Sequence, residues 1–207
     1  MIGRRTAFIL LVYAALLPEP ARARDLDSRT FMPTLGRATT PVGFVDFCRR
    51  HPDDCRVRTA VPVVVTLNDD RWLDLIVVNR SVNSRVIAST DLEVFGREEY
   101  WEYPVSGRGD CEDYVLEKRR DLMWRGWPAS ALLITVVRDE DGAGHAVLTV
   151  RTDHGDLILD NKVDIIRPWF QTPYSYIKRQ SPFDSAGWDR IDDRRPDSSV
   201  ASIVPSR

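Results

Sequence analysis

The stretch that decides the fold reads Gly109-Asp110-Cys111-Glu112-Asp113-Tyr114, one cysteine flanked by acidic residues. After it, apolar side chains recur at steps of three and four up to Met123, the spacing of a helix with one face against a core. Acidic residues suit the first turn of a helix, where unpaired N–H groups and the positive dipole end favour negative charge. The stretch therefore places a thiol at the start of a packed helix, where the dipole lowers a thiol's pKa and neighbouring carboxylates raise it.

Two further segments have helical spacing, residues 43–50 and residues 70–86. Asn68 or Asp69 can cap the second one. The inward face of this helix, which we expect to run from Trp72 to Val86, carries Asn79 and Asn83. Buried amides of this kind more often bond a neighbouring loop than a ligand, and we expect that here.

Three β-branched runs follow the cysteine helix, at residues 131–138, 145–151 and 156–160. Turns rich in glycine and aspartate, residues 139–144 and 153–155, separate them and predict two hairpins. We therefore expect an α+β domain with helices packed on an antiparallel β-sheet. Aromatic residues gather on both sides of this region, in segments 95–103 and 163–176. The first can form a substrate wall or core, and the second an aromatic cover or one more strand.

The ends of the chain differ from this domain. Arg4 and Arg5 precede the apolar run of residues 7–17, and Ala21 and Ala23 are small residues two apart. This is the layout of a cleaved secretory signal, because a run of about eleven residues falls short of the roughly twenty needed to span a bilayer. We expect a signal peptide at residues 1–23, one folded domain at residues 24–183 that begins with an irregular arm, and a polar, disordered tail at residues 184–207.

Composition limits the function. The chain has 207 residues, of which 43% are hydrophobic, enough for one domain with a sizeable core. Loss of residues 1–23 removes three arginines and one glutamate, which changes the formal charge from −2 to −4. A mildly acidic protein has no electrostatic reason to bind nucleic acid or an anionic membrane. We therefore expect an exported protein with no stable membrane insertion.

The three cysteines have different expected roles. Cys48 and Cys55 are seven apart, which is compatible with a small disulfide loop in an oxidising compartment, although spacing alone does not prove the bond. Pairing them leaves Cys111 unpaired. An unpaired exported thiol indicates a reactive role rather than a buried small residue.

A thiolate nucleophile needs a base, and the base needs a third group to fix its tautomer. Among the three histidines, His51 lies in the cysteine loop and His154 in a tight turn, so His145 at a strand start is the best base by elimination. Asp160 ends the next strand, but hairpin counting does not place it directly opposite His145. A diagonal contact or a bulge is required, and Asn161 can take the orienting part instead.

The order of cysteine, histidine and aspartate, carried in residues 109–114, 144–148 and 159–161, resembles the bacterial transglutaminase-like cysteine proteinases, the LapG-type periplasmic proteases. The resemblance covers about residues 40–188, and three linked motifs are far more specific than one cysteine. It implies a papain-like, transglutaminase-like core. It also implies that Cys111 is the nucleophile, His145 the general base and acid, and Asp160 the orienting carboxylate.

Calcium dependence is a further implication of the resemblance, with Asp110 and Glu112 as ligands and Asp113 as a third. Carboxylate oxygens are hard ligands that suit Ca²⁺, and three acids in four positions repel one another without a cation. Without the resemblance, the same residues are more simply acids favoured by the helix dipole.

The family's substrate is a large surface adhesin, cut near its N-terminus, and an inner-membrane receptor for cyclic di-GMP restrains the protease. The resemblance thus implies a calcium-dependent periplasmic cysteine endopeptidase that controls biofilm attachment. Another thiol acyl-transfer enzyme, either a transglutaminase or a peptidoglycan amide hydrolase, is the alternative. A calcium-dependent binding module is a third possibility, against which the intact triad positions argue.

Overall fold

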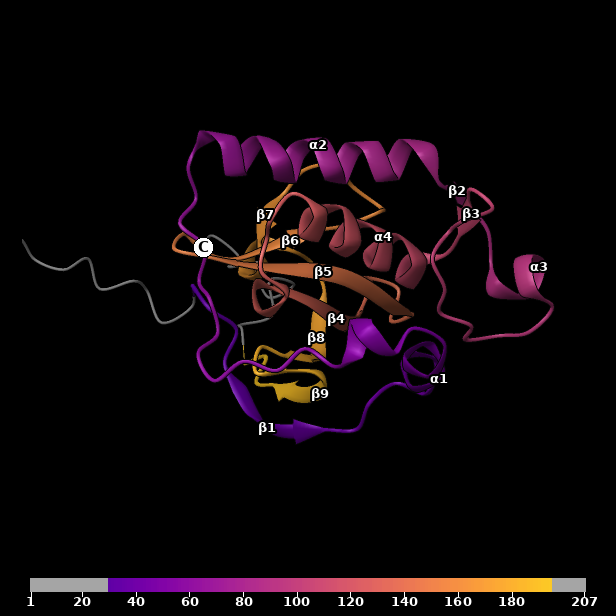
Figure 1. Ribbon diagram of the computed structural model, residues 1–207, viewed down its shortest axis with the longest axis horizontal. Coiled ribbons are helices and arrows are strands. Elements are labelled where there is room, and N and C mark those ends of the chain that lie inside the picture. The colour runs from indigo at the N-terminus through magenta and orange to yellow at the C-terminus, as the bar shows by residue number, and fades with distance from the viewer. Residues whose placement is uncertain (1–29, 195–207) are drawn as a thin grey trace, which may run out of the picture.

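A seven-stranded sheet with the order β1-β9-β8-β4-β5-β6-β7 is the centre of the computed structural model, which describes residues 30–194 (Figure 1). Neighbouring strands are antiparallel throughout this sheet. Its strands are β1 (Thr34–Ala38), β4 (Leu132–Arg138), β5 (Gly144–Thr152), β6 (Gly155–Leu159), β7 (Arg167–Pro168), β8 (Ser175–Ser181) and β9 (Asp184–Ile191). The three strands predicted from β-branched runs are β4, β5 and β6, so the predicted α+β class is confirmed.

Both faces of the central strands are covered, which explains their nearly continuous apolar sequence. On β5, Leu148 belongs to the main core together with residues from the helices. Val147 points to the opposite face, into a second cluster that contains Trp169 and Tyr176. The successive residues of one strand thus serve two cores.

The helices pack on one side of the sheet or at its ends, and α2 and α4 lie side by side above β5 in Figure 1. The helices are α1 (Val42–Arg50), α2 (Asp69–Arg85), α3 (Asp91–Phe95) and α4 (Cys111–Trp124), with short 3₁₀ turns η1 (Pro52–Cys55), η2 (Ala129–Ala131) and η3 (Trp169–Gln171). A small parallel pair, β2 (Ile87–Ala88) with β3 (Arg108–Gly109), leads into α4. The predicted cap of α2 is confirmed, because Oδ1 of Asn68 accepts a hydrogen bond of 2.8 Å from the backbone N–H of Arg71.

The prediction that Trp72 lies on the inward face of α2 is wrong, since this residue is 38% exposed. Asp74 contacts Arg125 and Trp127, which come just after α4 has ended. Trp72, which is still nearer the start of α2 than Asp74, therefore lies beyond the end of α4.

The predicted tail is wrong for residues 184–191, because these residues form β9. Trp188 of this strand is only 1% exposed and Ile191 is buried as well, although Asp184, Asp189 and Arg190 make the strand polar in composition. Composition alone therefore resembles that of a polar tail. Part of the expected irregular arm is likewise a strand, since β1 pairs with β9. The predicted signal peptide and the residues after Arg194 lie outside the described part of the chain.

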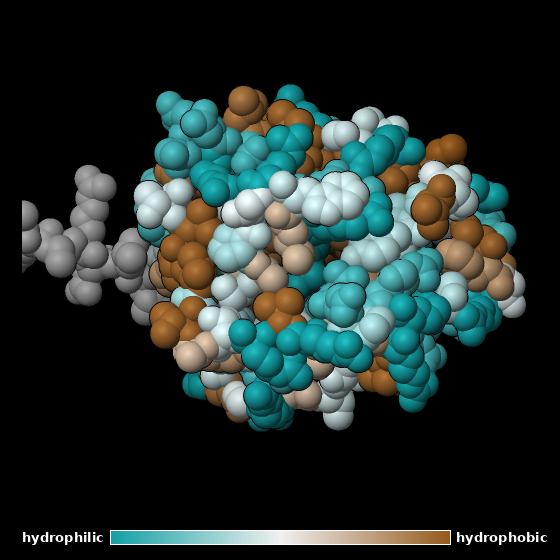
Figure 2. Space-filling view, viewed as in Figure 1, coloured by the Kyte–Doolittle hydropathy of each residue, from teal (hydrophilic) through white to brown (hydrophobic). Residues whose placement is uncertain are grey.

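The predicted disulfide is present and joins Cys48 in α1 to Cys55 in η1, with an S–S distance of 2.01 Å. Residues 163–176 contain the short strand β7 as well as the buried aromatic rings of Trp169 and Tyr174, so both alternatives for this segment hold in part. None of the helices within residues 30–194 has the length and apolarity needed to cross a bilayer. On the face shown in Figure 2, hydrophobic side chains form small groups between hydrophilic ones.

Candidate active site

A cleft of about 360 Å³ lies where the start of α4 meets the sheet, and both Cys111 and His145 line it. Val136 of β4 and Lys178 of β8 continue this lining across neighbouring strands. Trp101 stands on the helical side of the cleft and also packs edge-on against Phe44 and Trp188. The aromatic segment before the cysteine therefore supplies both core and cleft wall.

Cys111 is the first residue of α4, so the helix starts where predicted, and Asp110 is its N-cap residue without a capping hydrogen bond from its side chain. The turn before it depends on a glycine, since a Cβ atom on Gly109 would lie 2.5 Å from Oδ2 of Asp113. The carbonyl of Gly109 accepts a hydrogen bond of 3.0 Å from the N–H of Ser89, which fixes the strand end beside the thiol. The cysteine thus lies at a helix start whose backbone N–H groups have no partner within the helix. Such groups can stabilise the negative charge that develops on a carbonyl oxygen during attack by a thiolate.

His145 and Asp160 form a buried pair, with 2.9 Å between Nε2 and Oδ1. Leu148 pairs with Leu159 without a register shift, so Asp160 falls opposite Val147. The contact is therefore the predicted diagonal one and needs no bulge. Because Nε2 contacts the carboxylate, Nδ1 is the ring nitrogen left for a thiol.

The carboxylate of Asp160 accepts hydrogen bonds from other groups besides the histidine. Its Oδ1 also accepts from the N–H of Lys162 at 3.0 Å, and its Oδ2 accepts from the hydroxyl of Tyr174. Burial raises the pKa of Asp160, but the hydrogen bonds from His145, Tyr174 and the backbone outweigh it and leave the pKa below its usual value. The carboxylate is therefore ionised and able to orient an imidazole.

Two amides of α2 fix the turn that carries Asp160. Nδ2 of Asn83 donates to the carbonyl of Asp160 at 2.9 Å and to Oδ1 of Asp164 at 2.8 Å, while Nδ2 of Asn79 donates to the carbonyl of Asp164 at 3.1 Å. The prediction that these amides bond a loop is confirmed. The sequence reading did not identify Tyr174, whose only signal was its place in an aromatic run.

The other histidines lie outside this arrangement. His51 contacts Glu102, with 2.6 Å between Nε2 and Oε1, and stacks on Phe47. The side chain of His154 is 67% exposed in its turn. Asn161 is not the partner of the histidine, because Asp160 takes that position.

The acids around the thiol are buried without enough compensating charge. Sγ of Cys111 lies 2.9 Å from Oε2 of Glu112. Burial, followed by the charge of Asp110, raises the pKa of Glu112 to about 9, and burial raises that of Asp113 to about 8. Burial and the neighbouring Glu112 also raise the pKa of Cys111 well above its usual value. Without added positive charge, this site therefore favours the protonated thiol.

A fourth acid, the buried Asp91, joins the three predicted ones. Carboxylate oxygens of Asp91, Asp110 and Asp113 lie within 4.8 Å of one another. Each of the three side chains has one buried oxygen with no hydrogen-bond partner among residues 30–194. Glu112 belongs to a neighbouring group with Asp110 and Cys111. Converging, unpartnered carboxylate oxygens fit a hard divalent cation such as Ca²⁺.

Asp91 escaped the sequence reading because it begins a short helix of its own. Thr90 and Glu93 form a capping box around α3, so an acid in this first turn has an ordinary local explanation. Nothing in the local pattern indicates that the loop after α3 returns to the start of α4. The spatial grouping of Asp91 with Asp110 required the tertiary fold.

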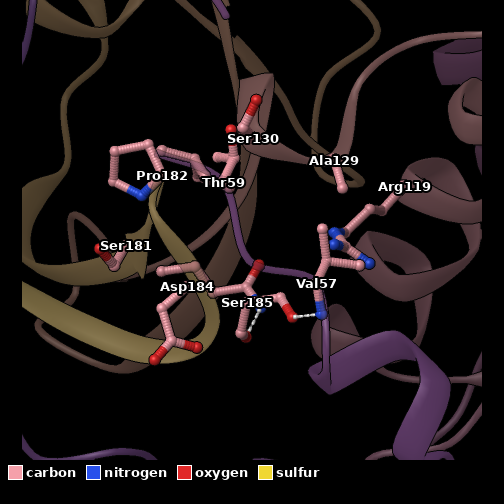
Figure 3. Close-up of a pocket in the computed structure, with 11 residues that line it drawn as sticks. Val57, Thr59, Arg119, Ala129, Ser130, Ser181, Pro182, Asp184 and Ser185 are labelled. Atoms are coloured by element: carbon pink, nitrogen blue, oxygen red, sulfur yellow. Dashed lines mark hydrogen bonds between the residues drawn. The ribbon is translucent and has the colours of Figure 1, made fainter. Parts of the chain in front are cut away.

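A second cavity, beside Arg119 and the β8–β9 hairpin, is far smaller, at about 10 Å³ (Figure 3). Val57 and Ser185 bridge it through two hydrogen bonds of 3.1 Å. Such a volume holds about one water molecule, so this cavity is not a substrate site.

Comparisons with known proteins identify the family of this chain. The family described as bacterial transglutaminase-like cysteine proteinase matches residues 34–196. The EGTA-treated structure of LapG from Legionella pneumophila is similar, with 27% identity and a TM-score of 0.51 over 60% of this chain and 69% of that one. The calcium-bound structure of the same protein has 26% identity and a TM-score of 0.50 over 63% and 74%. A search of curated proteins found no match.

Proposed function

Since the chain belongs to the family of bacterial transglutaminase-like cysteine proteinases and is therefore a cysteine protease, we propose that Cys111, His145 and Asp160 form its catalytic triad. One observation carries this proposal. The buried contact between His145 and Asp160 lies at the same cleft that holds the thiol at the start of α4.

In this mechanism the Cys111 thiolate attacks the carbonyl carbon of a peptide bond, after His145 has taken the thiol proton. Backbone N–H groups at the start of α4 stabilise the oxyanion. The C–N bond then breaks as the imidazolium donates its proton to the leaving amine, which gives a thioester. Water, deprotonated by His145, attacks the thioester and releases the acid and the thiol. Asp160 keeps the imidazole in one tautomer throughout.

The proposed metal is Ca²⁺, held by the predicted ligands Asp110 and Asp113 together with Asp91, and with Glu112 as a further acid beside it. The calcium-bound structure of the similar LapG supports this choice of cation. When bound, Ca²⁺ supplies positive charge that offsets the carboxylates around Cys111. The chain's own acids position the start of α4 around it.

The proposed substrate is the N-terminal region of a large surface adhesin, cut in the periplasm to control biofilm attachment, with an inner-membrane cyclic di-GMP receptor as restraining partner. The family resemblance supports the substrate and partner. The disulfide between Cys48 and Cys55 supports an oxidising compartment, because such bonds are rare in the cytosol. The secretory layout of residues 1–23 agrees with export.

The test is cleavage of the N-terminal region of an adhesin from the same organism by wild type and Cys111→Ala, with Ca²⁺ or with EGTA. We expect a cut only with wild type and Ca²⁺. Cleavage by Cys111→Ala would refute the nucleophile, and full activity of metal-stripped protein would refute the calcium requirement. Adding an amine donor and a glutamine peptide separates the alternative, since crosslinking without hydrolysis would show a transglutaminase.

A further inference from the structure

Lys118 is a fully buried lysine in α4, two helical turns after Cys111. Its Nζ has no hydrogen-bond partner within residues 30–194. A buried ammonium group is costly unless opposite charge compensates it. The negative charges near Lys118 therefore indicate the role of this lysine.

Two contacts between α2 and α4 locate this side chain. The hydroxyl of Tyr114 donates to the carbonyl of Val86 at 2.6 Å, and Nη1 of Arg125 donates to Oδ1 of Asp74 at 3.0 Å. The two helices are thus antiparallel, and equal steps from the two contacts bring Lys118 level with Val82 and with Ser81 of α2. This level lies between the two asparagines that bond the turn of residues 160–164.

The negative charges acting on Lys118 are the carboxylates of Asp160 and Asp164, at the two ends of that turn. Burial lowers the pKa of Lys118 to about 7, while these two carboxylates raise it. Oδ1 of Asn79 and Oδ1 of Asn83 are buried acceptors with no partner among the described residues. Lys118 is therefore level with the two asparagines that bond this turn, and its charge interacts with the carboxylates at both ends of the turn.

We propose that Lys118 is a positioning residue that acts through Asp160: its ammonium group balances the carboxylates of Asp160 and Asp164 and holds the turn of residues 160–164 so that Asp160 meets Nε2 of His145. This inference rests on the proposed triad. The lysine touches neither substrate nor thiol. Substitution of Lys118 should therefore slow the chemical step, which lowers kcat, and leave substrate binding unchanged.

A double-mutant cycle tests the inference, with Lys118→Met, Asp160→Asn and the double variant. The readouts are kcat and KM for peptide cleavage and the rate at which iodoacetamide alkylates Cys111. We expect Lys118→Met to lower kcat and the alkylation rate about tenfold with KM unchanged, a loss that corresponds to about 1.4 kcal/mol. In the Asp160→Asn background the same substitution should change neither rate further.

The matched control is Leu122→Ala, another fully buried residue of α4, which should lower the melting temperature and leave the alkylation rate unchanged. An equal loss from Lys118→Met in both backgrounds, or a loss of melting temperature alone, would overturn the inference. Rates unaffected by Asp160→Asn would instead overturn the proposed triad. If Lys118→Met does not fold, the double variant Lys118→Met/Asp164→Asn replaces it, because it also removes one carboxylate that the lysine no longer balances. The tenfold loss of kcat and of the alkylation rate is then expected relative to the single variant Asp164→Asn.

Discussion

Nε2 of His145 lies 2.9 Å from Oδ1 of Asp160 even though strand register sets Asp160 opposite Val147. The diagonal contact holds the imidazole by the nitrogen remote from the thiol. Asp160→Asn can donate as well as accept at this position, so it loses control of the tautomer. We expect kcat to fall about 10³- to 10⁴-fold, as for triad aspartates elsewhere, in a peptide-cleavage assay. His154→Asn removes an exposed histidine and should leave kcat unchanged; a fall in that control would mean that the site has been misplaced.

Tyr174→Phe removes a hydrogen bond to an ionised carboxylate, which is worth about 1.5–3 kcal/mol. The folded-state pKa of Asp160 lies below its unfolded value, so its hydrogen bonds stabilise the protein above the unfolded pKa and this benefit disappears as pH falls through the folded pKa. The difference in unfolding free energy between wild type and variant should therefore be largest near neutral pH and shrink below about pH 4. Denaturant unfolding between pH 7 and pH 3 measures it.

The control for that experiment is Tyr114→Phe. The hydroxyl of Tyr114 donates to a backbone carbonyl, that of Val86, at 2.6 Å. Its acceptor does not titrate, so the cost of Tyr114→Phe should stay constant over the same pH range. A constant cost for Tyr174→Phe as well would contradict the ionised state of Asp160.

Asp91→Asn should weaken Ca²⁺ binding at least about tenfold, because one of three converging charged ligands becomes neutral. In EGTA the variant should melt at a higher temperature than wild type, since one buried repulsion is gone. With Ca²⁺ the wild type should instead melt at the higher temperature, because it binds the ion more tightly and its folded state is therefore stabilised more. Calorimetric titration measures the Ca²⁺ affinity, and melting curves with and without Ca²⁺ measure the change in melting temperature.

The control for this experiment is Asp70→Asn, in the exposed first turn of α2, which should change neither the Ca²⁺ affinity nor the melting temperature. Equal Ca²⁺ affinity of Asp91→Asn and wild type would remove Asp91 from the site.

Asp156 anchors the second core cluster to the N-terminal segment. Its Oδ2 accepts from Nη1 of Arg179 at 2.7 Å and from the N–H of Met32 at 2.9 Å, and the residue is fully buried. Asp156→Ala leaves the guanidinium buried and unpaired, which should cost about 3–5 kcal/mol in denaturant unfolding. The exposed pair of Arg49 and Asp46 provides the comparison, and Asp46→Ala should cost at most about 1 kcal/mol. Similar costs for both would mean that Asp156 is not effectively buried in solution.

Local patterns in the sequence indicate Cys111 and His145 as members of the proposed triad, but the family resemblance was needed to choose Asp160 over Asn161. Cys111 follows Gly109 and Asp110 at the start of α4. His145 comes directly after the turn of residues 139–144, and Asp160 comes directly after the strand that follows the turn of residues 153–155. Hairpin register is a local property, so the diagonal between the last two can be counted outward from the turn of residues 153–155. These roles remain predictions until the variants are measured.

The residues that escaped prediction depend on contacts distant in sequence. Asp91 meets Asp110 only because the loop after α3 turns back, and Tyr174 meets Asp160 only across the edge of the sheet. The strand containing Trp188 has the composition of a tail because polar residues such as Ser185 and Asp189 become covered only when β9 pairs with β1 and β8. Local propensity carries none of this information, since packing partners decide it.

The order of strands has a consequence for protein synthesis. Val42, near the N-terminus, and Lys178, near the C-terminus, line the same cleft, and the first strand of the sheet pairs with the last. A nascent chain that has emerged only as far as Tyr174 already contains Cys111, but it lacks the two strands that complete the cleft and connect it to β1. The complete cleft therefore requires residues 175–191, so it can form only after almost the whole of the described chain has been made.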